Sequence, residues 1–367
     1  AVVRPTTLVT VAGRVYAVAE SARYVAWRGC DSVGVGDVSG HRFPAIRVPK
    51  SAGFGCQLLY WANFGLIDHD ILAILDGTVT WSKWGYGNST DYASFGAAQI
   101  TSGHSVRSVL PSNLWASDQG EPAGSYIVGP VSDGRDLLYG VTKIRNDRSC
   151  TEEQASDGTC PLATSGTVWR VDSKLQRHPL TAAAATFIAF SGGRVALVPH
   201  AEGQPPDLGL TGRLFRQPEA TVLLLRLADG TRIGSVDLAG EPYELALSAQ
   251  LGAVLVGERA KNPRVHITTP AQLQWFDPRH GGSAESLTVA ADAEALSVAG
   301  NRIIFRQGRR ILSYSPGDSK PTLVAQGTPG STITGPVLSG TRLVWAETSK
   351  QGGRLVSRIR TLTLSGS

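Results

Sequence analysis

The chain has 367 residues, of which 42% are hydrophobic and 18% charged, a balance that is typical of a packed globular protein and excludes a disordered one. Its net charge of +5 is carried by scattered single residues without a Lys/Arg run, which argues against a nucleic-acid partner. No run of about 18 apolar residues predicts a membrane span, and the 42 Gly and 20 Pro residues favour many short strands over long helices.

An internal repeat of a short apolar strand, a tight turn and a second apolar strand recurs along the chain. The turns contain Asp-Gly, Ser-Gly and Gly-Asn pairs, which tolerate the positive φ angles that tight hairpins require. The strands on either side are almost continuously apolar, as expected where neighbouring sheets cover both of their faces. In chain order the copies read AVAESARYVAW, AILDGTVTW, PVSDGRDLLYG, AFSGGRVALV, ALSAQLGAVLV, SVAGNRIIF and PVLSGTRLVW.

The spacing of the turns leaves room for two more strands in each unit, so each unit is predicted to be an antiparallel sheet of strands A, B, C and D. The last unit offers only three strands, whereas the N-terminal segment RPTTLVTVAG resembles the D strand KPTLVAQG of the sixth unit. We therefore expect Thr6–Ala12 to complete the last sheet and remove the open edge of a ring. In a single domain, the predicted units span about 14–48, 66–112, 124–181, 184–240, 242–290, 293–327 and 331–364 plus 6–12.

This pattern resembles the seven-bladed β-propeller superfold, in the loose TolB-like, YVTN and quinoprotein-like grouping. The resemblance covers nearly the whole chain and is architectural, because the Gly-His and Trp-Asp signature of WD40 repeats and the Kelch pattern are both absent. It implies an all-β ring of four-stranded antiparallel blades. It does not imply one function, since this superfold hosts lyases, hydrolases, lactonases, dehydrogenases and binding scaffolds.

One face of the predicted ring carries most of the elaboration. Because strand direction alternates in a blade, the B–C loops and the D–A connectors emerge on the same face. Blades three, four and five have long B–C loops in succession, and long loops in compact domains often carry function. His200 and Arg213 in the loop of blade four and His266 in that of blade five are candidate binding residues, although each histidine would also fit a solvated loop.

Aromatic residues form a second elaboration of this face. The connector PKSAGFGCQLLYWANFGLIDHD between blades one and two contributes four of them, Phe54, Tyr60, Trp61 and Phe64. Trp84 and Tyr86 end the B strand of blade two, and Trp115 is expected in the connector that follows blade two. Aromatic side chains on a concave rim stack against sugars or apolar partner groups, but they equally plug a channel mouth and cover blade edges. The binding candidates are Tyr60, Trp61, Phe64, Trp84, Tyr86 and Trp115.

Three carboxylates are the candidate catalytic residues. Asp68 and Asp70 open the A strand of blade two, and Glu241 precedes that of blade five, so all three are expected near the central channel. The first two would also suit Ca²⁺, but a polar strand start that satisfies backbone donors explains them equally well. No calcium-loop, zinc, P-loop or nucleophile-elbow motif is present, so no metal site and no cofactor is predicted.

The four cysteines show no CxxC spacing, which argues against zinc ribbons and thioredoxin-like redox sites. Cys150 and Cys160 share one polar loop that a disulfide would order, and Cys30 and Cys56 then form the second pair. With a chain that begins at Ala1 and contains no Met, these disulfides predict an extracytoplasmic protein whose targeting segment has been removed. Four reduced thiols in a cytosolic protein are the alternative.

Three functions remain open. The favoured one is a secreted or cell-surface propeller that binds a protein or a glycan through the long-loop face. The second is a hydrolase or lyase that acts on a carbohydrate or lactone at the channel mouth. The third is a structural subunit of an extracellular assembly, in which copies of the chain contact one another.

Overall fold

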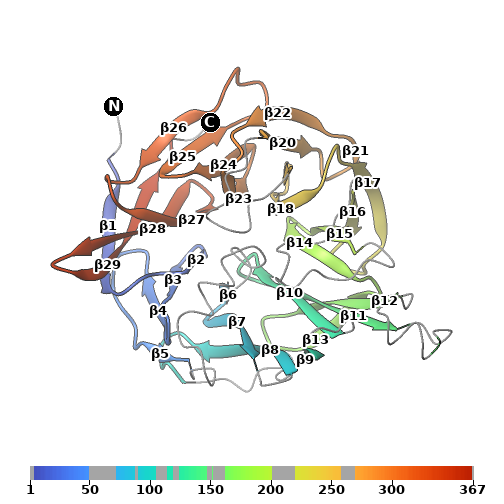
Figure 1. Ribbon diagram of the computed structural model, residues 1–367, viewed down its shortest axis with the longest axis horizontal. Helices are drawn as coiled ribbons and strands as arrows, with labels where there is room; N and C mark the ends of the chain where they lie inside the picture. Colours follow the sequence, from blue (N-terminus) through green and yellow to red (C-terminus); the bar gives the residue numbers. More distant parts are fainter. Residues whose placement is uncertain are drawn as a thin grey trace.

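The computed structural model describes residues 4–48, 72–86, 90–104, 114–118, 124–146, 151, 162–200, 220–257 and 269–365. All regular structure in these ranges is β-strand, and the strands form seven antiparallel blades around a common centre (Figure 1). The seven-bladed β-propeller predicted from the repeat is confirmed. None of the helices that a membrane span would need is found in this part of the chain.

From the inner strand outward, blade one contains β2 (Ala17–Glu20), β3 (Tyr24–Arg28), β4 (Ser32–Asp37) and β5 (Ile46–Arg47). Blade two contains β6 (Leu72–Leu75), β7 (Thr78–Tyr86), β8 (Thr90–Gln99) and β9 (Leu114–Asp118). Blade three contains β10 (Gly124–Ser132), β11 (Leu137–Asn146), β12 (Leu162–Val171) and β13 (Arg177–Thr181). Blade four contains β14 (Ala185–Ser191), β15 (Arg194–Pro199), β16 (Thr221–Arg226) and β17 (Arg232–Asp237).

Blade five contains β18 (Pro242–Leu247), β19 (Gly252–Val256), β20 (Ala271–Phe276) and β22 (Glu285–Val289). Blade six contains β23 (Ala293–Ala299), β24 (Arg302–Gln307), β25 (Arg310–Tyr314) and β26 (Thr322–Gln326). Blade seven contains β27 (Thr332–Ser339), β28 (Arg342–Gln351), β29 (Arg354–Thr363) and β1 (Thr6–Ala12).

The N-terminal strand closes the ring, as predicted. β1 pairs antiparallel with β29, from Thr6 opposite Thr361 to Ala12 opposite Val356. In Figure 1 the blue first strand lies along the red last strand, so the two ends of the chain meet in one blade. Val9, at the middle of β1, is buried, so the closing strand supplies core packing as well as backbone hydrogen bonds.

The buried hydrophobic residues that the structure describes form seven clusters, each of which lies between two successive blades. The cluster between blades seven and one shows the arrangement: Val344 and Ile359 of blade seven pack with Val9 and face Val25 and Trp27 of blade one. This arrangement explains why the inner strands are apolar on both faces, since each blade is sandwiched between two others.

Two departures from regular blades concern the outer strands. Ser117 at the end of β9 pairs with Gly124 at the start of β10, so blades two and three share continuous hydrogen bonding. Trp115 therefore lies on the outer strand of blade two, and its expected place in a connector is wrong. Because polar residues follow Leu114–Asp118 directly, the sequence suggested a connector here instead of a strand.

In blade four, β21 (Gly282–Ser283) adds a parallel fifth strand beside β17.

A cross-strand pairing of tryptophan with glycine recurs in the blades. Gly34 on β4 lies opposite Trp27, and Gly96 on β8 lies opposite Trp81. A Cβ atom at either glycine would lie only 2.3 Å from the indole ring. Both tryptophans are buried, so their rings occupy the space that the missing side chain leaves.

Replacing Gly34 by Ala should therefore lower the free energy of unfolding by about 2 kcal/mol, because the new methyl group displaces the buried ring of Trp27. The control is Gly77→Ala in the β6–β7 turn, where an added Cβ meets nothing within 4 Å. Its effect should stay within about 0.5 kcal/mol. Urea unfolding of both variants measures the difference, and equal stabilities would contradict the proposed packing.

Candidate functional site

A cavity of about 350 Å³ opens at the inner end of blades six, seven and one. Its walls come from the connector before β2, the start of β23, the β24–β25 turn and the start of β27. The β24–β25 turn is a B–C loop, the segment before β2 is a D–A connector, and β23 and β27 begin where D–A connectors end. The cavity therefore lies on the face of the B–C loops and D–A connectors that the sequence favoured. We call this face the loop face, and we call the cavity the inner cavity. Its charged lining residues are Arg14, Glu294, Arg306 and Arg309.

A buried carboxylate of the neighbouring blade shapes the wall that β23 provides. Glu244 on β18 is only 2% exposed, and its two oxygens accept the backbone N–H groups of Ala295 at 3.0 Å and of Leu296 at 2.6 Å. The pairing of β23 with β24 shifts between Glu294 and Ser297, which marks a β-bulge. Ala295 has a φ of 60°, an unfavourable left-handed conformation that these two hydrogen bonds stabilise.

The Arg306 side chain ties blades six and seven together at the cavity. Its Nη2 lies 2.8 Å from Oε1 of Glu294, and its Nε donates to the carbonyl oxygen of Gly335 at 3.0 Å. Its Nη1 donates to the carbonyl oxygen of Gly308 at 3.1 Å. With contacts to three segments and a side chain that is 15% exposed, this guanidinium is held in one place.

The other two arginines also contact groups at the cavity wall. Nη1 of Arg309 donates to the carbonyl oxygen of Thr328 at 2.8 Å, and the guanidinium carbon of Arg14 lies 5.5 Å from the centre of the Tyr16 ring. Both side chains are partly exposed. In the part of the wall that the structure describes, the charged groups are three guanidinium groups and one carboxylate, so this part carries a net positive charge.

A second buried carboxylate supports the position of Arg309. Oε1 of Glu347 accepts the hydroxyl of Thr328 at 2.6 Å and its backbone N–H at 2.8 Å, and Arg360 lies 3.7 Å from Oε2. Burial by itself would raise the pKa of Glu347, but these donors and the Arg360 charge hold it below its ordinary value. The ionised Glu347 thus fixes Thr328, and the carbonyl oxygen of Thr328 accepts a hydrogen bond from Arg309.

Many of the predicted site residues fall outside the part of the chain that the structure describes: Tyr60, Trp61, Phe64, Asp68, Asp70, Arg213 and His266. The backbone places Trp84 and Tyr86 at the end of β7 and Trp115 on β9, with β8 between these strands. Their predicted binding role stays a prediction.

Two predicted residues are described in full, and neither lines the inner cavity. Glu241 directly precedes β18 on the loop face, where its carbonyl oxygen accepts the N–H of Gly257 at 2.9 Å. His200 directly follows β15 and is buried, and its N–H donates to the carbonyl oxygen of Ala184 at 2.9 Å. His200 therefore belongs to the base of its loop and is not a solvated loop residue. Among the described residues, no group of three or more His, Cys, Asp and Glu could hold a metal ion.

The cavity residues Arg14, Glu294, Arg306 and Arg309 were not among the sequence candidates. Glu294 and Arg306 lie on strands beside short connectors, and Arg14 and Arg309 lie in a short connector and a turn, whereas the sequence candidates came mainly from long loops. Two short sequence patterns could nevertheless have pointed to the arginines of the cavity. The B–C turn of blade six reads RQGRR, and the predicted closure brings the GRVY segment after β1 beside blade seven.

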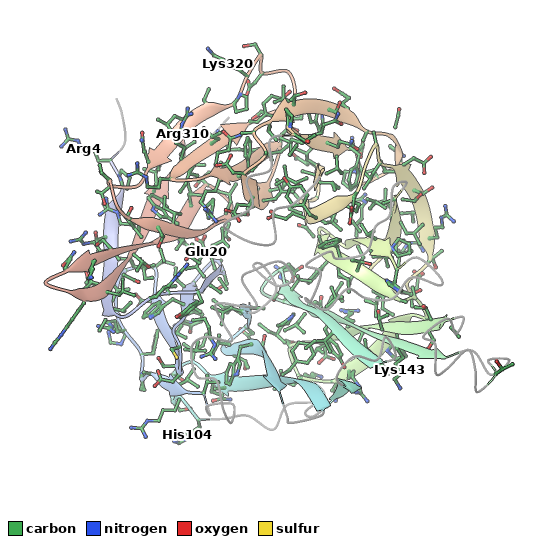
Figure 2. The ribbon with its side chains drawn as sticks, in the orientation of Figure 1. Arg4, Glu20, His104, Lys143, Arg310 and Lys320 are labelled. Carbon is green, nitrogen blue, oxygen red and sulfur yellow. The ribbon has the colours of Figure 1, made fainter. Side chains whose placement is uncertain are left out.

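At the inner end of blade one, the opposite face carries a buried carboxyl group in contact with an arginine. Glu20, at the end of β2, pairs with Nε of Arg342 on β28, and Nη2 of this arginine donates to the carbonyl oxygen of Ser21 at 2.7 Å. Figure 2 shows Glu20 beside the centre of the ring, while His104 and Lys320 lie at its outer edge. Burial raises the pKa of Glu20 to about 8, although Arg342 opposes the shift.

The stability of the protein should consequently fall as the pH rises from about 5 to 8. The folded state keeps the Glu20 proton up to about pH 8, whereas the unfolded chain releases it near 4.5. Between pH 5 and 8 the free energy of unfolding should fall by on the order of 4 kcal/mol, which lowers Tm by roughly 5 °C. Glu20→Gln mimics the neutral acid and should flatten this slope, whereas Glu285→Gln on β22 should preserve it. Thermal unfolding across the pH range tests this, and stability that rises from pH 5 to 8 would contradict it.

Comparisons with known proteins support the fold. No protein-family model matches the chain, and no curated protein matches it in sequence. Similar solved structures include the Pan2 WD40 domain of Neurospora crassa, with a TM-score of 0.50, 12% identity and coverage of 99% of this chain and 98% of that one. A chain of the mitotic checkpoint complex has a TM-score of 0.50, 11% identity and coverage of 98% and 93%. Oligogalacturonate lyase from Vibrio parahaemolyticus has a TM-score of 0.49, 12% identity and coverage of 98% and 93%. At these identities the likeness concerns the propeller fold alone.

Proposed function

We propose that the protein is a binding propeller that holds its ligand, a protein or a glycan, on the loop face. The observation that supports this proposal is the inner cavity, which opens on the predicted face and is walled by three blades. Cavities of a few hundred Å³ with convergent polar groups are the usual form of ligand sites. Sites at the inner end of the loop face can also gather residues from blades that are far apart in the sequence.

The cavity wall is arranged before any ligand arrives. Arg306 is fixed by three contacts from two blades, and Arg309 is fixed through Thr328 and the buried Glu347. Because these side chains lose little freedom on binding, such a wall favours recognition. A rigid ring whose blades are joined by apolar clusters is a suitable support for this wall.

The proposal is tested by filling the cavity. Thr332 is an exposed residue of its lining, so Thr332→Trp should block entry without disturbing the core. Thr322→Trp is the matched control, since Thr322 is also exposed but lies on the outer strand β26. Both variants and the unmodified protein are applied to a glycan array and to a panel of immobilised extracellular proteins.

We expect the unmodified protein and Thr322→Trp to bind the same glycan or protein, and Thr332→Trp to lose at least 90% of that signal. Absence of any bound glycan or protein with the unmodified protein would refute the proposed function. Equal binding by all three proteins would show that the ligand is held elsewhere and would refute the proposed site.

We further propose that the protein works outside the cytoplasm with disulfides Cys30–Cys56 and Cys150–Cys160. In support, Cys30 is present in its disulfide-bonded form, while the other three cysteines lie outside the described residues. Disulfides persist in oxidising compartments. Peptide mapping of the protein without reduction should recover both cross-linked pairs, and four alkylated free cysteines would refute this proposal.

A further inference from the structure

We infer that the inner cavity binds a sugar that bears a carboxylate, a uronic acid unit. This inference rests on the proposed function and adds the chemical class of the ligand. The first support is the charge of the lining. Among the described lining residues, the one carboxylate, Glu294, is paired with Arg306 at 2.8 Å, whereas Arg309 contacts a neutral carbonyl oxygen. With Arg14 on the same wall, the cavity has positive charge in excess and favours an anion.

The second support is the presence of acceptors beside the arginines. Glu294 accepts hydrogen bonds only, and Thr332 offers a hydroxyl at the cavity rim. A phosphate group would bring further acceptors and negative charge against the Glu294 carboxylate. A hydroxylated carboxylate instead presents an anion to the guanidinium groups and donates its hydroxyls to Glu294. An acidic peptide side chain supplies the carboxylate but not these hydroxyl donors.

The third support is the size and the apolar part of the cavity. Its volume of about 350 Å³ lies near the lower end of ligand sites, which suits one sugar unit rather than a long segment of chain. Ala295 and Ile333 contribute buried apolar groups to the lining, against which the C–H face of a pyranose can pack. One wall therefore matches each part of a uronic acid: its carboxylate, its hydroxyls and its ring.

Calorimetric titration with four probes tests the inference: D-glucuronate, D-glucose, glucose 6-phosphate and an Asp/Glu-rich peptide. Glucuronate and glucose share a ring and differ in the carboxylate, so we expect glucuronate to bind at least 10-fold more tightly. Glucose 6-phosphate and the peptide should also bind at least 10-fold more weakly than glucuronate. The glucuronate affinity should decrease as the salt concentration rises.

Adjacent arginines supply a matched pair of variants. Arg309 lines the cavity, whereas Arg310 is exposed on β25 and does not. Arg309→Gln should weaken glucuronate binding at least 10-fold, and Arg310→Gln should change it less than two-fold. Thermal unfolding of both variants verifies that they are folded.

Failure of this inference is distinct from failure of the proposed function. If glucose binds as well as glucuronate, or if Arg309→Gln has no effect on binding, the acidic-sugar inference is wrong. A binding signal that Thr332→Trp abolishes would still support the proposed function. If the peptide or the phosphate binds most tightly, the ligand class is an acidic peptide or a phosphate, and the inference is likewise overturned.

Discussion

Replacing Val9 by Asp should destabilise the protein by about 3 kcal/mol or more, while the same change at the neighbouring Thr10 should cost less than about 0.5 kcal/mol. Both residues lie on the closing strand β1, but Val9 is buried against Val344 and Ile359, whereas Thr10 is exposed. An ionised Asp at position 9 would lie in the apolar cluster between blades seven and one. At position 10 it would face Arg358 on β29.

Urea unfolding and size-exclusion chromatography measure this difference. We expect Val9→Asp to show a lower unfolding midpoint and more association, because a displaced β1 exposes the edge of β29. Thr10→Asp should remain monodisperse with the original midpoint. Equal stability of the two variants would contradict the closure of the ring by β1.

Replacing Glu244 by Gln should lower the free energy of unfolding by about 2 kcal/mol and weaken binding at the inner cavity. An amide group has only one acceptor oxygen, so it would lose the bond to the N–H of Ala295 or of Leu296 and direct an N–H against it. The β-bulge that holds Ala295 in the cavity wall would then relax.

Urea unfolding and glucuronate titration measure the two effects on the same variant. Glu285→Gln serves as the control, because Glu285 is an exposed residue of blade five. A Glu244→Gln variant with the original stability and affinity would show that the carboxylate does not hold the bulge.

The ring and its closure were predictable because short segments of the sequence carry a recurring pattern. Each A–B hairpin carries its own turn residues and apolar strands, and RPTTLVTVAG repeats the pattern of KPTLVAQG, so the pairing of β1 with β29 followed from similarity within the chain. The outer strand β9 was not predicted, because it lacks such a local pattern. Its five residues have no repeated turn, and polar residues follow them directly.

The sequence marks some of the arginines of the inner cavity, but the geometry of the cavity was not predictable, because it depends on contacts between distant residues. Glu244 accepts a hydrogen bond from the N–H of Leu296 in the neighbouring blade. Arg306 pairs with Glu294 and donates to the carbonyl oxygen of Gly335. Nothing in the sequence around Glu244 distinguishes a buried positioning residue from a solvated strand residue. The long loops pointed to blades three to five, whereas the described cavity is built from strand ends and short connectors of blades six, seven and one.

The most direct test of ligand binding at the inner cavity is a crystal structure of the protein with D-glucuronate. We expect ordered density in the inner cavity, with the carboxylate within hydrogen-bonding distance of Arg309 and a hydroxyl beside Glu294. Glucuronate density that occurs only over the loops of blades three to five, or an empty cavity at a saturating concentration, would contradict the assignment.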